Sequence, residues 1–373
     1  MKESQSYLHR VKERLAIFGR NLARLCRFMS SPDTSSEMSK ILFAEISNPS
    51  YERYLYLLLK FFEIAGFSVR FRFNLKTLLN LRNYSELILN LKGFQIVLKE
   101  PEHAAIALSD RPRSASRAIE ISTNYFRSDI RTVRDFVFPY QMHPLMYENG
   151  LYKCLESSRK QRRDIRIFYS GNTGIAYDNP DIYKMYGKLS RRRITEILEL
   201  EFANGELCKI EDYSENCDFN IPDQPPLVMF KNFTVGLRDW VRWVARSEFF
   251  IAAPGVCMPF SHNIIESMAA GTIPITEYPE MFDPPLVSGT NCLAFQGDAG
   301  LIEAVRNAMS ISEDEIGRMK QAVSDYYDLY LEPVSVINRL QERLPNIERI
   351  ILNSEHMSLY ELKKGTLDDL PTS

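Results

Sequence analysis

Polar side chains suited to binding a ligand gather within residues 249–278 of this chain. Ser261, His262 and Asn263 occupy the expected start of a helix, and Glu266 follows one turn later. The unpaired N–H groups and partial positive charge of a helix amino terminus suit a phosphate, with a dipole contribution of about 0.3–1 kcal/mol. Glu266 can accept hydrogen bonds from neutral hydroxyls such as those of a ribose or hexose. These residues fit a phosphorylated, hydroxylated ligand, and they leave open the alternative of a surface helix whose polar face is merely solvated.

The elements that position these side chains follow one another as strand, loop, helix and strand. Residues 249–253 are an apolar run that ends in Pro-Gly, as expected of a buried parallel strand. Ser261 is the expected N-cap of a helix over 262–270, Gly271 closes that helix, and 272–276 is a second apolar run. The loop of such a βαβ unit lies at the carboxyl end of a strand, where open α/β sheets bind ligands.

A second strand and loop of this kind lies upstream. Residues 165–170 form a clean strand candidate, and Gly171 and Asn172 then open a Gly-Asn-Thr-Gly loop. Its glycines let backbone N–H groups approach a diphosphate, although the same pattern also makes an ordinary turn. Arg191 and Arg193 belong to three consecutive arginines that open a later helix and can reach a pyrophosphate, at about 1.5–3 kcal/mol per bond. Three adjacent arginines cannot all face one site, so at least one is expected in solvent.

Length and composition exclude several classes of protein. A chain of 373 residues favours two domains, and a net charge of −2 argues against a protein that coats nucleic acid. The six cysteines are scattered without a C-x-x-C pair, which fits a reduced, cytoplasmic compartment. No run is long enough for a transmembrane helix, and no apolar core of a signal peptide is present. The sequence has neither a Walker A motif nor G-x-G-x-x-G, which argues against an NTPase or a nicotinamide enzyme.

The first 29 residues predict a basic amphipathic helix, with seven Lys and Arg residues against two Glu. Two interpretations stay open: contact with anionic lipids, at about 1 kcal/mol per basic residue, or docking on the protein itself or on a partner. We expect this helix and its linker in 1–36, a first domain in 37–150, a second domain in 151–332, and a carboxyl-terminal helix that crosses back, with a tail, in 333–373. Strands alternating with helices in both domains predict parallel sheets covered on both faces.

The run A-P-G-x(6)-H-N-I-I-E-S-M-A-A-G-T-I-P-I, which follows a W-x(4)-A-R-S-E-F-F-I segment, resembles the donor-nucleotide site of GT-B glycosyltransferases. The exostosin-like and fucosyltransferase-like pattern is the most similar. The resemblance is specific only over 249–275. It implies an α/β fold of two Rossmann-like domains that face each other across a cleft, with a nucleotide-sugar donor held by the second domain and an acceptor by the first.

The resemblance also implies roles for individual residues. Gly171 and Asn172 would lie beside the diphosphate, and Arg191 or Arg193, together with Lys231, are placed like the basic residues that pair with it. At the helix start, the phosphate or sugar would be contacted by Ser261, His262 and Asn263. Glu266 would accept hydrogen bonds from the ribose or sugar hydroxyls. Two departures stand out. Met258 replaces the first Glu of the E-x(7)-E pattern of many retaining enzymes, and His262-Asn263 replaces the Glu-Lys pair expected for a GDP-fucose donor.

Sugar transfer needs a stabilised leaving diphosphate and, where the anomeric centre inverts, a base. The chain contains no D-x-D pair, the usual holder of a divalent metal in the other glycosyltransferase fold, so we expect no metal or other cofactor. His143 and Asp110 are the candidate bases. We therefore predict a transferase that acts on a glycan or lipid-linked acceptor in polysaccharide or surface glycan assembly, in the cytoplasm or at the inner face of a membrane. An inactive GT-B scaffold that binds a glycan or partner, and a nucleotide-sugar epimerase, are the alternatives.

Overall fold

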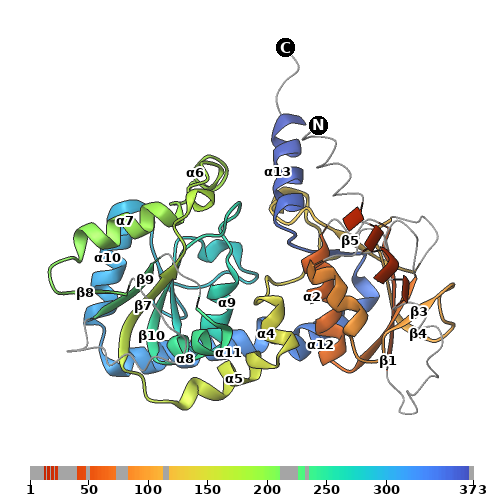
Figure 1. Ribbon diagram of the computed structural model, residues 1–373, viewed down its shortest axis with the longest axis horizontal. Helices are drawn as coiled ribbons and strands as arrows, with labels where there is room; N and C mark the ends of the chain where they lie inside the picture. The colour runs from red at the N-terminus through yellow and green to blue at the C-terminus, as the bar shows by residue number, and fades with distance from the viewer. Residues whose placement is uncertain are drawn as a thin grey trace. The chain divides into compact units, whose positions relative to one another are not determined.

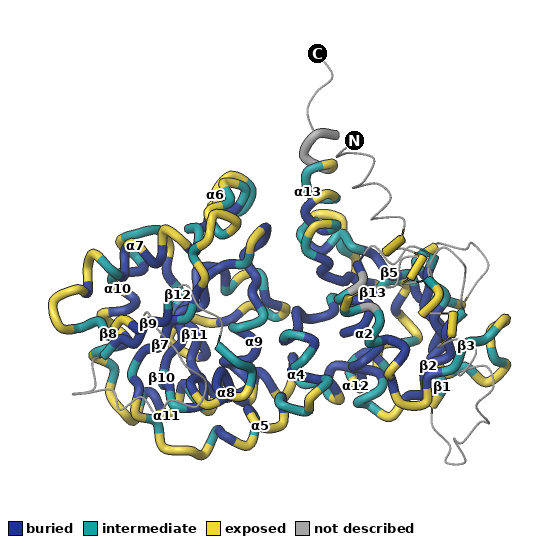
Figure 2. The backbone as a smooth tube through the Cα atoms, viewed as in Figure 1, coloured by how far each residue is buried: buried dark blue, intermediate teal, exposed yellow. Residues whose placement is uncertain are grey.

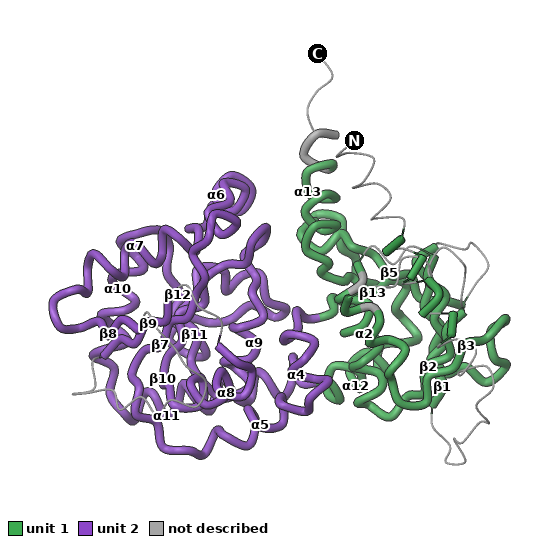
Figure 3. The backbone as a smooth tube through the Cα atoms, viewed as in Figure 1, with its two compact units in different colours: residues 1–138, 333–373 green, residues 139–332 purple. Residues whose placement is uncertain are grey.

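The computed structural model describes residues 40–47, 51–72, 83–111, 117–210, 226–231 and 235–368, together with short runs within 12–23. The chain forms two compact units (Figure 3). Unit 1 contains residues 1–138 and 333–373, and unit 2 contains residues 139–332. The first crossing between units therefore lies at 138/139, upstream of the boundary expected at 150/151.

Unit 1 is built on a seven-stranded sheet in which every described pairing is parallel (Figure 1). The strand order is β3-β2-β1-β4-β5-β13-β6. The strands are β1 (Lys40–Glu45), β2 (Phe67–Arg72), β3 (Gln95–Val97), β4 (Ala104–Ser109), β5 (Ile119–Ser122), β6 (Asp135–Val137) and β13 (Arg349–Ile351). Apart from β13, this is the order of a Rossmann fold.

Helices alternate with or follow the strands of unit 1, and α2 packs against the sheet. The helices are α2 (Glu52–Ile64), η1 (Asn83–Asn90), η2 (Ser128–Ile130), α12 (Pro333–Arg343), η6 (Leu344–Asn346) and α13 (His356–Asp368). Helix α2 is apolar nearly all round and packs between the sheet, η1 and α12, so almost its whole surface is buried (Figure 2). Gly66 ends it with a φ of +86°. The sequence pattern over residues 75–91 is mostly helical; it lies partly outside the described residues, and its described end is the 3-10 helix η1.

Most of the predicted basic helix of residues 1–29 lies outside the described residues. Its described positions are helical, with Leu15 and Leu22 exposed, and Arg20 lies 3.6 Å from Glu86 of the same unit. Among the helices that the structure describes, none is both long and apolar enough to cross a membrane.

An ion pair fastens the returning chain to unit 1. Arg349, the first residue of β13, lies opposite Asp135, the first residue of β6. Its Nε and Nη2 donate to the two Asp135 carboxylate oxygens at 2.7 and 2.8 Å, and the Thr132 amide donates at 2.6 Å. Burial alone would raise the pKa of Asp135, but these hydrogen bonds outweigh it and hold the pKa below its usual value. The carboxylate therefore stabilises the folded state at neutral pH.

Replacing Asp135 with Asn should cost about 3 kcal/mol at pH 7, because it leaves the Arg349 charge without its partner. Since the folded-state pKa is lowered, the stabilisation is present above the unfolded pKa of about 3.9 and disappears as pH falls through the folded value. Amide hydrogen exchange of peptides spanning β13 and β6 measures this directly. Glu348→Gln is the matched control, because Glu348 and its partner Arg134 are both exposed and such pairs contribute about 0–1 kcal/mol. Equal exchange in the two variants would contradict the prediction.

Unit 2 is built on a six-stranded parallel sheet of order β12-β11-β10-β7-β9-β8. Its strands are β7 (Ile165–Gly171), β8 (Leu207–Ile210), β9 (Leu227–Lys231), β10 (Ser247–Ala252), β11 (Ile273–Thr276) and β12 (Leu293–Ala294). The helices are α4 (Pro144–Glu148), α5 (Leu151–Ser157), η3 (Ser158–Lys160), η4 (Ile175–Tyr177), α6 (Asp181–Tyr186), α7 (Arg191–Glu201), α8 (Leu237–Ala245), α9 (His262–Ala269), η5 (Pro279–Met281), α10 (Gly297–Ser310) and α11 (Glu313–Tyr330).

The helices of unit 2 form two groups. Helices α7 and α10 pack together, while α5, α8, α9 and α11 contact one another in a second group. Right-handed crossovers that run in opposite directions from β7 place these groups on opposite faces of the sheet. Trp240 and Trp243 pack into the core with Phe168, Phe230 and Phe250, so both indoles serve packing.

The predicted fold class is confirmed, since each unit is a Rossmann-like parallel sheet with helices. The strand at 249–253, the helix at 262–270 and the closing Gly271, with a φ of +69°, also lie where predicted.

Candidate functional site

The two predicted ligand loops meet at one place on the sheet of unit 2. From β7 the chain moves to β8 and β9 on one side, then crosses to β10 on the other side of β7. Open parallel sheets bind ligands at such a switch point, outside the carboxyl ends of the two central strands. One loop begins directly after Gly171, the last residue of β7, and the loop 253–261 follows β10. The topology therefore brings both loops to the same edge.

Each loop has, within it or at its start, a glycine that leaves no room for a side chain. A Cβ on Gly171 would lie 2.4 Å from the hydroxyl of Tyr169, which is buried and hydrogen-bonded to Thr195 at 2.7 Å. A Cβ on Gly255 would lie 2.6 Å from the carbonyl oxygen of Phe260. The second contact is with backbone, so only a movement of the loop itself could relieve it.

Gly255→Ala should therefore destabilise unit 2 by about 1–3 kcal/mol. Urea unfolding followed by tryptophan fluorescence measures this unit, because both tryptophans of the chain lie in it. Gly317→Ala in α11 is the matched control. A Cβ there meets nothing within 4 Å, and alanine in a helix is favoured over glycine by about 0.5–1 kcal/mol. A Gly255→Ala protein as stable as the parent would show that the loop is not so closely packed.

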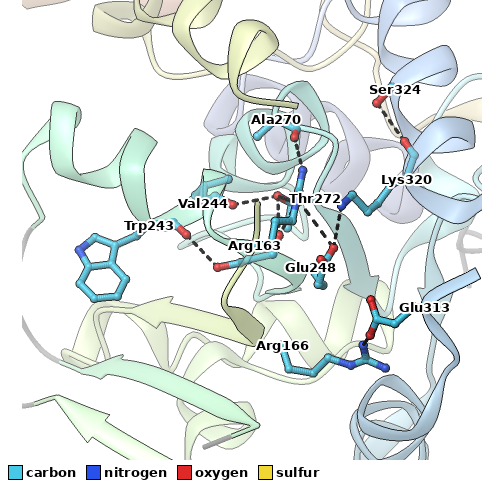
Figure 4. A network of polar contacts seen from close by, with 11 residues as sticks. Arg163, Arg166, Trp243, Val244, Glu248, Ala270, Thr272, Glu313, Lys320 and Ser324 are labelled. Carbon is cyan, nitrogen blue, oxygen red and sulfur yellow. Dashed lines mark hydrogen bonds and ion pairs between the residues drawn. The ribbon is translucent and has the colours of Figure 1, made fainter. Parts of the chain in front are cut away.

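Helix α9 is fixed at its carboxyl end by arginines (Figure 4). Arg159 Nε donates to the Ala269 carbonyl at 2.8 Å. Arg163 Nη2 donates to the Ala270 carbonyl at 2.6 Å, as Figure 4 shows. Arg163 also donates to Thr272 Oγ1 at 2.7 Å. Burial lowers the pKa of Arg163 to about 10, so it remains a cation at neutral pH. Cations at this end satisfy the last carbonyls of the helix and complement its dipole. The amino end of α9 follows the loop after β10, at the switch point.

The amino end of α9 begins at Ser261, which is buried and has extended backbone angles. Its side chain makes no capping hydrogen bond to any described residue. His262 and Asn263 follow and are half-buried. A helix start without a side-chain cap keeps backbone donors for a ligand or for water.

Of the three consecutive arginines, Arg191 is the one that the structure buries at the site. Its Nε donates to the Pro254 carbonyl at 3.0 Å, and its guanidinium lies 4.2 Å from the centroid of the Tyr177 ring. Arg193 is half-exposed and pairs with Asp298. The expectation that at least one arginine would be solvated is thus confirmed, and the helix directs Arg193 away from the loop that Arg191 contacts.

The remaining predicted diphosphate contacts are engaged locally. Lys231 ends β9 beside Gly171 in the sheet register, and its Nζ lies 2.7 Å from Glu199 Oε1. Asn172 is exposed, and its Oδ1 accepts the Gly174 amide at 2.8 Å. This bond is the side-chain-to-backbone contact of an Asx turn.

Two buried residues at the end of β11 escaped the sequence prediction. Glu277 accepts the Leu189 amide at 2.6 Å and the Gly297 amide at 2.8 Å, and burial raises its pKa. Tyr278 is almost fully buried, and burial raises its pKa. Hydrogen bonds to the Thr276 side chain and the Ser261 backbone, together with the charge of Arg191, act in the opposite direction on the pKa of the Tyr278 hydroxyl. The position of Glu277 and Tyr278 directly after a parallel strand was the signal that could have identified them.

His143 belongs to unit 2, and not to the first domain as predicted. Its ring lies 5.1 Å from that of His262, measured between centroids. Its backbone amide donates to Glu266 Oε1 at 3.0 Å. Glu266 was expected on a polar helix face open to ligand, but only 2% of its surface is exposed. The segment that carries His143 covers it.

Asp110 lies in unit 1 and follows β4 at the switch point of that sheet, beside the end of β1. Both of its carboxylate oxygens accept the Ser47 amide at 2.9 Å, and Oδ1 also accepts the Ser47 hydroxyl at 2.9 Å. Arg111 Nε donates to that hydroxyl at 2.8 Å. The nearby Tyr51 hydroxyl is buried without a hydrogen-bond partner in the described part of the chain.

No protein-family model matches this chain, and no curated protein matches it. Among solved structures it is similar to a glycosyltransferase from Rickettsia africae, at 11% identity, TM-score 0.40, and coverage of 83% of this chain and 98% of that chain. Anabaena HepE in complex with UDP gives 9% identity, TM-score 0.40, and 83% and 100% coverage. AviGT4, a glycosyltransferase involved in avilamycin A biosynthesis, is 11% identical, with a TM-score of 0.40 and coverage of 83% of this chain and 98% of that chain.

Proposed function

We propose that the protein is a glycosyltransferase that binds a nucleotide-sugar donor in unit 2 and transfers the sugar to a glycan or lipid-linked acceptor. The main observation is that several features meet at one switch point. They are two loops with a sterically required glycine, the amino end of α9 and the buried Arg191. A helix start and a guanidinium provide positive charge and directed donors for a diphosphate. The resemblance of residues 249–275 to GT-B donor sites supports the sugar nucleotide as the source of that diphosphate.

The proposed reaction breaks the bond between the anomeric carbon and the diphosphate oxygen. Negative charge then develops on the diphosphate, and preorganised donors stabilise it more strongly than they stabilise the ground state. Arg191 and the α9 amino end are the groups that we assign to this role. Because the chain has no D-x-D pair, we propose that these groups take the place of a divalent metal.

For an inverting reaction, we propose Asp110 as the base that takes the acceptor proton. Its carboxylate is half-buried and held in one orientation by Ser47. A base fixed in this way needs no reorganisation before proton transfer. The position of Asp110 at the second switch point of the molecule supports this role, since that is where unit 1 is expected to hold a ligand.

The donor site is tested by thermal unfolding with UDP, GDP, CMP, dTDP and ADP, each at millimolar concentration. One nucleotide at about 100 times its dissociation constant should add roughly 2.7 kcal/mol and raise the melting temperature. Arg191→Gln should weaken the binding of that nucleotide by about 10- to 100-fold, because a charge-assisted hydrogen bond is lost. Arg192→Gln is the control, since Arg192 is exposed and pairs with Glu196 on its own helix. This site is contradicted if the parent protein binds none of the nucleotides, or if Arg191→Gln and Arg192→Gln bind the nucleotide equally well.

The enzyme is distinguished from an inactive scaffold by Asp110→Asn. The variant should bind the nucleotide normally but glycosylate water or an added oligosaccharide about 10²–10⁴ times more slowly, because the base is lost. Release of nucleoside diphosphate from the donor measures the rate. Asp129→Asn, an exposed carboxylate of the same unit, serves as the control. Unchanged turnover in Asp110→Asn would exclude it as the base, and absence of any turnover in the parent protein would favour the scaffold.

A further inference from the structure

One buried carboxylate of unit 2 holds the starts of two helices. Glu277 directly follows β11, and only 3% of its surface is exposed. Its Oε2 accepts the amide of Leu189, two residues before α7 begins, at 2.6 Å. Its Oε1 accepts the amide of Gly297, the first residue of α10, at 2.8 Å. Each carboxylate oxygen therefore holds a different segment of the chain.

The segment 187–189, which precedes α7, is fastened to the same place by further contacts. Lys188 Nζ donates to the backbone carbonyl of Glu277 at 2.6 Å and pairs with Glu280 at 2.7 Å. The side-chain nitrogen of Gln296 donates to the Gly187 carbonyl at 3.2 Å. The chain before α7 is thus fixed to the end of β11 and to the start of α10.

The first residue of α7 is Arg191, which the proposed function assigns to the diphosphate. Its Nε donates to the Pro254 carbonyl at 3.0 Å, in the loop after β10, and β10 is the neighbour of β11 in the sheet. Only one residue separates Arg191 from the Leu189 amide that Glu277 accepts. Arg191 is consequently held at both ends, its backbone through Glu277 and its guanidinium by Pro254.

A carboxylate suits this place better than a neutral side chain of the same length. Each amide meets a different oxygen of Glu277, whereas a glutamine would present a donor nitrogen to one of the two amides. Burial disfavours the charged form and raises the pKa of Glu277, while the two amides and Lys188 favour that form. A negative charge beside the first residue of α10 also complements the dipole of that helix.

We propose that Glu277 is a positioning residue for diphosphate binding, which holds the Leu189 backbone so that Arg191 faces the switch point. This inference rests on the proposed function for the role of Arg191. Both oxygens of the Glu277 carboxylate are occupied by backbone amides, so Glu277 acts through Arg191 and does not touch the ligand. The two residues should therefore affect anion binding as one unit.

The link is measured by NMR of protein labelled with ¹⁵N in arginine. Arg191 is buried and its Nε–H is hydrogen-bonded, and Arg191→Gln assigns this signal by its loss. Glu277→Gln should shift the signal before any ligand is added, because one of the two amides loses its acceptor. Glu280→Gln is the matched control, since Glu280 lies in the same loop but has an exposed side chain that pairs with Lys188. An unchanged Arg191 signal in Glu277→Gln overturns the proposal.

Lowering the pH tests the same link in the parent protein. A protonated carboxyl has a donor in place of one acceptor, so it too can hold only one of the two amides. The charged groups nearby come from the segment before α7, the loop after β11 and the start of α10; they are Lys188, which lowers the pKa of Glu277, Glu280, which raises it, and Asp298, which pairs with Arg193. Because burial raises the pKa, the Arg191 signal should move as the pH falls through a value above the usual 4.3 or so of glutamate. The same pH dependence in Glu277→Gln contradicts the proposal.

The effect on binding is measured by calorimetry with inorganic pyrophosphate. Glu277→Gln should weaken the binding of pyrophosphate about tenfold in the parent background. In the Arg191→Gln background it should weaken binding about twofold at most, because the arginine that Glu277 positions is already gone. A general disturbance of unit 2 would have the same effect in both backgrounds, and that result would refute the positioning role.

These tests separate the positioning role from the donor-site proposal. If Glu277 and Arg191 act as one unit on pyrophosphate but no nucleotide raises the melting temperature, the positioning role stands and the glycosyltransferase assignment fails. If Arg191→Gln weakens a nucleotide but Glu277→Gln changes neither the Arg191 signal nor binding, the glycosyltransferase assignment stands and the positioning role fails. If the parent protein binds neither pyrophosphate nor a nucleotide, both fail.

Discussion

The parallel direction of every strand in unit 2 is the constraint on which the rest of its structure depends. Parallel strands must be connected by crossovers over the faces of the sheet, so the sheet is buried on both sides and its loops collect at two edges. Because the chain moves from β7 first to one side and later to the other, the two central carboxyl-end loops diverge and leave a place for a ligand. Gly171 and Gly255 then keep both loops narrow, since a side chain at either position meets atoms that are already packed.

Electrostatic order along α9 completes this design. Arg159 and Arg163 donate hydrogen bonds to the last carbonyls of the helix, where the helix dipole is negative. The opposite, positive end of the helix follows the loop after β10 at the switch point. Arg191 adds a cation there, but it is held by a neutral carbonyl, that of Pro254. No carboxylate in the described part of the chain forms an ion pair with Arg191, in contrast to Arg193 and Lys231, which pair with Asp298 and Glu199. A cation held in this way retains its attraction for an anion.

Local patterns predicted the elements of the fold, and long-range packing decided what they do. The alternation of strands and helices and the closing role of Gly271 could be predicted because each reflects a backbone requirement of a few neighbouring residues. Strand β13 was not, since three residues give no periodic pattern and their partners in β5 and β6 are more than 200 positions away. The assignment of Glu266 to an open face failed for a similar reason. Helical periodicity shows which residues share a face, but not that a segment near His143 covers it.

The place of β13 has a consequence for the order in which the chain is made. β5 and β6 do not pair with each other, because β13 lies between them and pairs with both. During translation, all of unit 2 leaves the ribosome before β13 does, so unit 2 is free to fold while the sheet of unit 1 still lacks the interior strand that joins β6 to β5. Until residue 351 emerges, β5 and β6 are nascent edges with exposed N–H and C=O groups, the kind of surface that chaperones and other chains recognise.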